Sequence, residues 1–272
     1  MLSEALEWLF TPASRVARRM GHLAESIAIR ARQRRCRAAW ASHRAHTRAA
    51  LLDAVERDTR SERRRTALVL GSGPLLDIPL AELAARFESV WLVDLVHPWS
   101  ARWQAHGFSN VRLITHDVSE CLDGLLHDPH AAVPVPTRFL DEPSIDWVAS
   151  VNLVSQLPRL PAAWLVRRGR LDEAHAARFA QAMIEAHLAW LTAFAAPVCL
   201  VADLVQTEVD ARDETVELAD YRTLFQGWES TREWRWDVAP PGELATGGHA
   251  WHSVAALRKA TQPGALHSIR PV

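Results

Sequence analysis

The segment from Thr66 to Asp94 constrains the fold more than any other part of this chain. It begins with an apolar run that stops at Gly71, Ser72 and Gly73. Apolar residues then recur at helical spacing from position 75 to 87, and a second apolar run, 90–93, ends at Asp94. This order predicts a parallel strand–helix–strand unit. Its first turn would lie at the carboxyl ends of the strands, where open α/β sheets bind ligands.

The turn and the acid together indicate a ligand class. Glycines allow the backbone to approach a ligand closely, and an acid about 20 residues further on is placed to bind ribose hydroxyls. The segment therefore predicts a cofactor of the adenosine type. The alternative is that the glycines serve only the strand–helix turn and that Asp94 only ends a strand.

The strand–helix alternation continues downstream and then changes. Helices are predicted over 98–106 and 171–195, with a proline-rich loop over 123–143. The further strands predicted are 111–115, 145–151, 198–205, 228–238 and 251–257. Because no helical segment separates the last two, they predict an antiparallel hairpin. The fold class expected is α/β.

The N-terminal part differs in composition. Residues 1–65 contain fifteen arginines and seven acidic residues, a net charge of +8, so the remaining residues carry −9 against −1 for the whole chain. Helices are expected over 3–10, 13–48 (with a break near Gly21 or Ser42) and 48–60. We interpret 1–62 as a helical extension and 63–272 as the main domain. The extension either packs as a cap on the acidic body or contacts nucleic acid or anionic lipid.

Composition limits which structural features and which cellular location are expected for the protein. The three cysteines form no CxxC pair, which predicts neither a disulfide framework nor a zinc site. No apolar run of about 18 residues is present to span a membrane. Both points favour a cytoplasmic protein. The use of arginine at all but one basic position is typical of GC-rich bacterial coding.

From about residue 66 to 258 the chain resembles the class I S-adenosylmethionine-dependent methyltransferases. In that family a glycine-rich turn follows the first strand, acids end the second and third strands, and a polar loop follows the fourth. The resemblance implies a Rossmann-like, seven-stranded, mostly parallel sheet with a C-terminal antiparallel hairpin, and S-adenosylmethionine as cofactor. The cofactor contacts implied are Gly71, Ser72, Gly73, Asp77, Asp94, Leu95, Asp117, Val118 and Asn152. Gln156 and Tyr221 are implied on the substrate side.

The glycine turn departs from the family pattern at two positions. Val69 stands where the family has an acid, and Leu75 stands where it has a third glycine. Asp77 is the alternative source of the carboxylate that is missing at position 69, and it would be directed towards the amino group in the methionine part of the cofactor.

Several of these residues also have structural interpretations. Asp117 is suited to cap the next helix, and Asn152 and Gln156 to satisfy a loop backbone. The histidines His97, His249 and His252 are expected to be structural. Trp99 and Trp103 are candidates for the walls of an adenine pocket.

The resemblance implies a methyltransferase acting on a small molecule. No catalytic residue is predicted, since methyl transfer needs a base only when the acceptor carries a proton. One alternative is a nicotinamide-dependent oxidoreductase, although its fingerprint requires glycine where Leu76 stands and does not include the hairpin. The other is a non-catalytic protein whose basic arm binds a partner or RNA.

Overall fold

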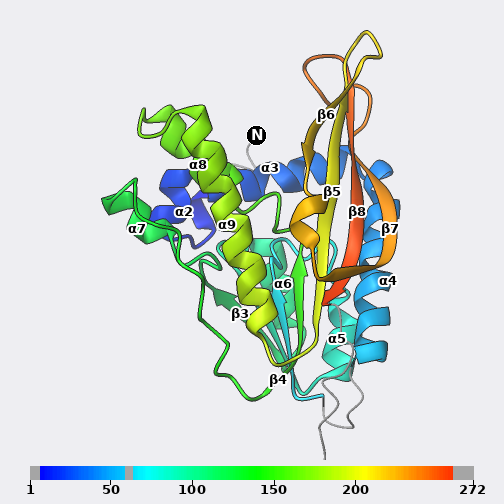
Figure 1. Cartoon of the computed structure of the whole chain (residues 1–272). Helices are drawn as coiled ribbons and strands as arrows, with labels where there is room; N and C mark the ends of the chain where they lie inside the picture. Colours follow the sequence, from blue (N-terminus) through cyan, green and yellow to red (C-terminus); the bar gives the residue numbers. More distant parts are fainter. Residues whose placement is uncertain (1–6, 59–63, 260–272) are drawn as a thin grey trace, which may run out of the picture.

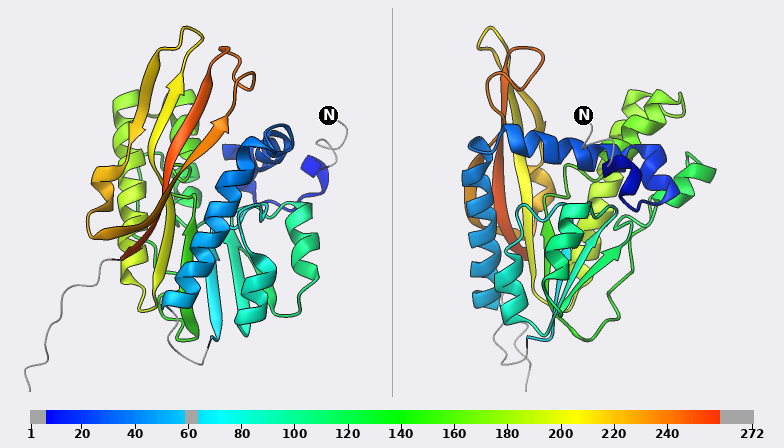
Figure 2. Two further views of the ribbon diagram at one scale, coloured as in Figure 1. Left: turned by 90° about the vertical axis from the view of Figure 1, so that its right-hand side faces the viewer. Right: turned by 180° about the vertical axis from the view of Figure 1, so that it is seen from behind.

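One mixed sheet with helices on both faces forms the protein (Figure 1). The computed structural model describes residues 7–58 and 64–259. The sheet has eight strands in the order β3-β2-β1-β4-β5-β8-β7, and β6 pairs with β5 off this path. Helix α9 covers one face of the sheet, and α4 and α5 cover the other (Figure 2).

The strands fall into a parallel and an antiparallel group. The parallel strands are β1 (Thr66–Leu70), β2 (Ser89–Asp94), β3 (Val111–Thr115), β4 (Ile145–Val151) and β5 (Val198–Val209). The antiparallel strands are β6 (Thr215–Asp220), β7 (Trp228–Ala239) and β8 (His249–Lys259). The expected α/β class and C-terminal antiparallel hairpin are therefore confirmed.

The sheet contains eight strands rather than the expected seven. Strand β5 runs four residues beyond its predicted end, and β6 pairs with that extension. Nearly every residue of β6 is exposed, so it presents no buried apolar face from which a strand could be predicted. Together with β7 and β8, these strands project beyond the parallel part of the sheet (Figure 1).

The helices follow the chain in this order: α2 (Arg15–Met20), α3 (His22–Arg35), α4 (Ala39–Asp58), α5 (Leu80–Arg86), α6 (Trp99–His106), α7 (Leu122–His127), α8 (Arg159–Arg167) and α9 (Glu173–Ala193). A short 3-10 helix, η1, spans Arg222–Phe225. No helix in the described ranges is long and apolar enough to cross a membrane.

The N-terminal helices pack on the body. The predicted break near Gly21 is confirmed, because Gly21 ends α2 with φ 94°. The second break lies at residues 36–38 and not at Ser42, which is inside α4. Of the helix predicted over 3–10, residues 3–6 lie outside the described residues, as do residues 59 and 60 of the helix predicted over 48–60. In α4, Trp40 and Leu51 share one buried cluster with the sheet.

Two basic side chains of α3 pair with the acidic body. Arg32 and Arg35 both bind Glu243, in the loop between β7 and β8. This contact supports the interpretation of the basic extension as a packed cap.

The helix expected after the glycine turn is shorter than predicted. Apolar spacing suggested a start near Leu75, but α5 begins at Leu80. Leu75 has φ 60° and takes part in the turn, and Pro79 is the residue before the helix. Leu75 and Ile78 are nevertheless buried, which explains the apolar spacing without a helix.

Candidate cofactor and acceptor site

The turn after β1 is tied to the end of β2. The backbone N–H groups of Gly71 and Ser72 both donate to the carbonyl of Val93. A Cβ at Gly71 would lie 2.6 Å from both the Val151 carbonyl oxygen and the Leu153 side chain. Packing against the end of β4 is therefore sufficient to require glycine at position 71.

Asp94 closes this turn through its carboxylate. The Gly73 N–H donates to Oδ2 at 2.8 Å, and the Val96 N–H donates to Oδ1 at 3.2 Å. Burial raises the pKa of the Asp94 carboxyl above its usual range, while the amides of Val96, Gly73 and Leu95 oppose that rise. Since a carboxylate has about four acceptor positions, each Asp94 oxygen can accept a further hydrogen bond.

A second polar group forms where β1 and β4 end. The Asn152 side chain donates through Nδ2 to Asp77 Oδ2 at 3.1 Å. The Trp234 indole N–H donates to His43 Nδ1 at 3.0 Å, so the hydrogen of a neutral His43 is on Nε2. That nitrogen lies 3.7 Å from Asp77 Oδ2. His43 Nε2 also lies 3.4 Å from Asn152 Nδ2. Two donors therefore lie side by side, and both face the Asp77 carboxylate.

Asn152 itself is held in an unusual conformation. Its φ is 54°, in the left-handed region that asparagine tolerates better than most residues. Its backbone N–H donates to the Val201 carbonyl, which fixes the loop to β5. Its Oδ1 is buried and accepts no hydrogen bond from the described residues. The Asn152 Oδ1 and the Asp77 carboxylate are thus neighbouring acceptors suited to an ammonium group.

The structure places the remaining implied cofactor residues as follows. The Ser72 hydroxyl lies 3.2 Å from His97 Nε2, a buried ring whose pKa burial lowers to about 4. Val118 is buried in the cluster under α9. Leu95 and Val96 pack beneath α2 and α3, with Ala17 among their neighbours. The cofactor contacts of Ser72, Leu95 and Val118 stay predictions.

Asp117 serves as a cap, as the alternative interpretation stated. Its Oδ1 accepts from the backbone N–H and hydroxyl of Ser119, and its Oδ2 accepts from the N–H of Leu122, the first residue of α7. Its contact with adenine stays a prediction. Trp99 and Trp103 are 64% and 75% exposed on α6, so neither forms the wall of a buried pocket.

A third polar group, which the sequence did not predict, surrounds Asp203 in the middle of β5. The side chain of Asp203 is almost fully buried. Ser155 donates to its Oδ2 at 2.5 Å and Gln206 at 3.0 Å, and His252 Nδ1 lies 3.2 Å from the same oxygen. Despite the opposing effect of burial, these partners lower the pKa of Asp203. The other oxygen, Oδ1, has no partner among the described residues.

The Asp203 group lies close to the Asp77 group. Ser155 is three residues beyond Asn152 in the same loop. The Trp236 ring stacks on His43 at 4.0 Å and meets His252 edge-on at 5.7 Å. Two clusters of polar side chains therefore adjoin at the carboxyl ends of β1 and β4, beside the middle of β5.

The two implied substrate residues differ in their surroundings. Tyr221 is half-buried, and burial together with the charge of Asp203 raises its pKa. Gln156 is exposed, and its backbone N–H donates to Leu153. Their roles stay predictions. Within the described ranges no group of three or more histidine, cysteine or acidic side chains is arranged to hold a metal ion.

Comparisons with known proteins give only distant likenesses. No family model matches the sequence, and no curated protein matches it. Among solved structures, the N-methyltransferase NodS of Bradyrhizobium japonicum, in complex with S-adenosylhomocysteine, is 13% identical with a TM-score of 0.37, covering 78% of this chain and 86% of that chain. The magnesium protoporphyrin IX methyltransferase of Synechocystis is 11% identical with a TM-score of 0.37, covering 78% and 79%.

A precorrin 8W decarboxylase of Methanobacterium thermoautotrophicum gives similar values, with 15% identity, a TM-score of 0.37, and 79% and 90% coverage. Likenesses at this level establish neither the reaction nor the substrate. The fold class rests on the strand order and orientation of the chain itself.

Proposed function

We propose that this protein is an S-adenosylmethionine-dependent methyltransferase acting on a small molecule. The observation that carries the proposal is the placement of Asp94, Asp77 and Asn152 at the carboxyl ends of neighbouring parallel strands or in the turns that follow them. Acceptors for ribose hydroxyls and for an ammonium group are the groups that this cofactor requires. The strand order with its C-terminal antiparallel hairpin supports the same class.

Each residue has a stated task in this proposal. Asp94 accepts hydrogen bonds from the ribose hydroxyls, and the Gly73 amide holds its carboxylate in place. Asp77 and Asn152 Oδ1 accept from the methionine ammonium group, while His43 and Asn152 Nδ2 orient Asp77. When bound, the cofactor supplies a methyl group activated by the positive sulfonium. The protein then has to align the acceptor and exclude water.

The Asp203 group supplies the acceptor side. Asp203 faces Nδ1 of His252, which leaves Nε2 as the ring nitrogen able to take a proton from a hydroxyl or ammonium acceptor. His252, Ser155 and Gln206 together lower the pKa of the Asp203 carboxyl. This arrangement suits an acceptor that must lose a proton on methylation.

Calorimetric titration with S-adenosylmethionine, S-adenosylhomocysteine and NAD tests the cofactor assignment. We expect both sulfur compounds to bind and Asp94→Ala to weaken them by about tenfold or more, the effect of losing hydrogen bonds to a charged group. Asp141→Ala is the matched control, because Asp141 is exposed and forms none of the contacts described. Binding of NAD alone would overturn the proposal, as would equal weakening by both variants.

A further inference from the structure

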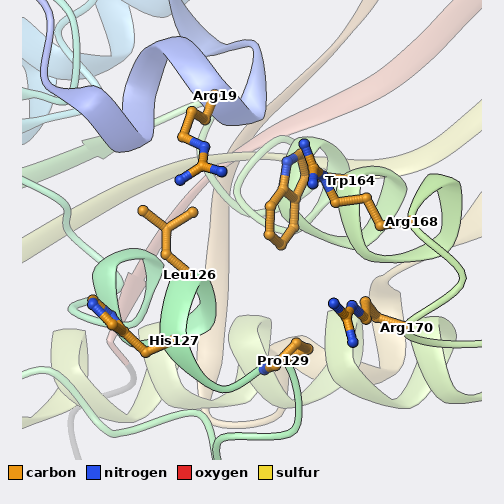
Figure 3. A pocket seen from close by; sticks show the side chains of 7 residues that line it. All are labelled: Arg19, Leu126, His127, Pro129, Trp164, Arg168 and Arg170. Carbon is orange, nitrogen blue, oxygen red and sulfur yellow. The ribbon is translucent and has the colours of Figure 1, made fainter.

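A basic hollow lies between α2, α7 and the end of α8 (Figure 3). Its volume is about 230 Å³. Arg19 of α2 and Arg168 and Arg170 at the end of α8 line it, and the guanidinium group of Arg168 lies beside the Trp164 ring (Figure 3). Trp164, Leu126 and Pro129 form apolar walls, and no carboxylate is among its lining residues. Residues about 150 positions apart in the sequence thus place three positive charges around one space.

These charges have no carboxylate partner among the described residues. No described acidic side chain forms an ion pair with Arg19, Arg168 or Arg170. Two other arginines, Arg222 and Arg258, do form such pairs, with Asp220 and Glu229 respectively. Gathering like charges is unfavourable, and an anion between them removes the repulsion while gaining charge-assisted hydrogen bonds.

The turn that ends α8 fixes the backbone positions of Arg168 and Arg170. Gly169 has φ 62°, its N–H donates to the Val166 carbonyl, and the Arg170 N–H donates to the Leu165 carbonyl. This is a Schellman ending of α8, and it satisfies those terminal carbonyls so that they do not compete for the guanidinium groups. The Arg168 guanidinium lies 4.9 Å from the centre of the Trp164 ring, which holds it over an apolar wall.

Trp164 contributes an apolar face to the hollow. Its side chain is 7% exposed, and its indole N–H is buried without an acceptor among the described residues, so this donor does not open into the hollow. The hollow is much larger than the roughly 30 Å³ that one water molecule occupies in the liquid. It therefore has room for an anion together with part of the group that carries it.

We propose that this hollow binds the phosphate group of a small phosphorylated molecule. Guanidinium groups match phosphate oxygens in pairs, and the indole face of Trp164 accommodates an attached apolar group. The proposal goes beyond methyl transfer and holds whether or not the cofactor binds. A ligand there would also tie α2 to α8, and the same α2 places Ala17 over Val96 beside Asp94.

Titration at low salt with inorganic phosphate and with phenyl phosphate tests this site, with chloride as the baseline ion. We expect saturable binding, tighter for phenyl phosphate because of Trp164. Arg168→Ala and Arg170→Ala should each weaken it by about tenfold, the effect of losing a charge-assisted bond. Arg167→Ala is the matched control, since Arg167 is exposed on the same turn but does not line the hollow. Unchanged melting temperatures would verify that the variants fold.

Three results would overturn the proposal. One is the absence of saturable binding above the chloride baseline. Another is equal weakening by Arg167→Ala and Arg168→Ala, which would indicate general surface charge. The third is tighter binding of a single-stranded RNA oligonucleotide than of phenyl phosphate, with the same loss in Arg168→Ala, which would assign the hollow to nucleic acid.

Discussion

Leu75 shows how a single residue can depart from a glycine-rich turn and still fit it. It stands where the resembled family has a third glycine, and it adopts φ 60° while its side chain is only 2% exposed. The left-handed conformation costs a residue with a Cβ about 1–2 kcal/mol. Burial of the leucine side chain offsets that cost.

Comparing Leu75→Gly with Leu75→Ala isolates the backbone strain. Both variants lose the buried side chain, and each should lower the free energy of unfolding by about 2–5 kcal/mol. Alanine keeps the strained backbone and glycine relieves it. We therefore expect Leu75→Gly to be the more stable by about 0.5–1 kcal/mol in urea unfolding, the reverse of the usual order. A more stable Leu75→Ala would contradict the turn geometry described for Leu75.

Asp77 and Asp94 should differ in which part of the cofactor they recognise. Asp77→Asn removes the charge facing an ammonium group and should weaken S-adenosylmethionine by roughly 10- to 100-fold. It should leave 5′-methylthioadenosine, which lacks the amino acid part, within about twofold. Asp94→Ala should weaken both compounds. The assignment of Asp77 fails if Asp77→Asn weakens both equally in calorimetric titration.

Some residues of the candidate site were predictable from the sequence and others were not. Asp94 was predictable because it ends an apolar run about 20 residues after the glycine turn. Asp203 lies inside a nearly continuous apolar strand, and its neighbour His252 is 49 positions further on. The antiparallel register that pairs Gln206 with His252 brings them together. A spacing pattern within one segment of the sequence cannot reveal a contact between side chains on two strands so far apart in the chain.

At the scale of elements, apolar runs predicted the strands well because most of them are buried. β1 is buried at all five residues and β4 at six of seven. The prediction failed for β6, which is stabilised by main-chain pairing on an exposed hairpin. It also left α8 unassigned, since this helix of nine residues contains Pro161 and follows Pro158.

Helices α2 and α3 pack next to the residues that follow Asp94. They lie over Leu95 and Val96, directly after Asp94, and their cluster at that point contains four buried residues. Opening these helices would uncover the proposed ribose side without disturbing the sheet. This packing is compatible with the interpretation of the N-terminal extension as a cap.

Hydrogen exchange measures this opening. We expect the amides of α2 and α3 to exchange faster than those of α4, because α4 packs Trp40, Leu51 and Val55 into the main core. S-adenosylhomocysteine should slow exchange in α2 and α3 more than in α4. Exchange of all three helices at one rate, with and without this compound, would rule out a separate opening of α2 and α3.

At the scale of the whole molecule, buried histidines couple stability to pH. Burial lowers the pKa of His22, His97 and His187 from 6.5 to about 4. Above pH 6.5 both folded and unfolded chains hold these rings neutral, so stability is fully present. As pH falls from 6.5 towards 4 the unfolded chain takes up protons first, and stability is lost.

His187→Gln tests one part of this dependence. His187 Nε2 lies 2.9 Å from the Ser150 hydroxyl, and glutamine can keep a polar partner there without titrating. The loss of unfolding free energy between about pH 7 and pH 4.5 should be smaller in the variant by roughly 2–3 kcal/mol. Urea unfolding at the two pH values measures it. An unchanged loss would mean that His187 is not held neutral in the folded chain.

A crystal structure grown with S-adenosylhomocysteine tests the proposed cofactor site most directly. We expect the ribose hydroxyls beside the Asp94 carboxylate, and the amino group within hydrogen-bond distance of Asp77 and Asn152 Oδ1. The sulfur should face the side on which Asp203 and His252 lie. Binding of the compound away from the turn after β1, or with its amino group at Asp94 and its ribose at Asp77, would rule out the proposed site.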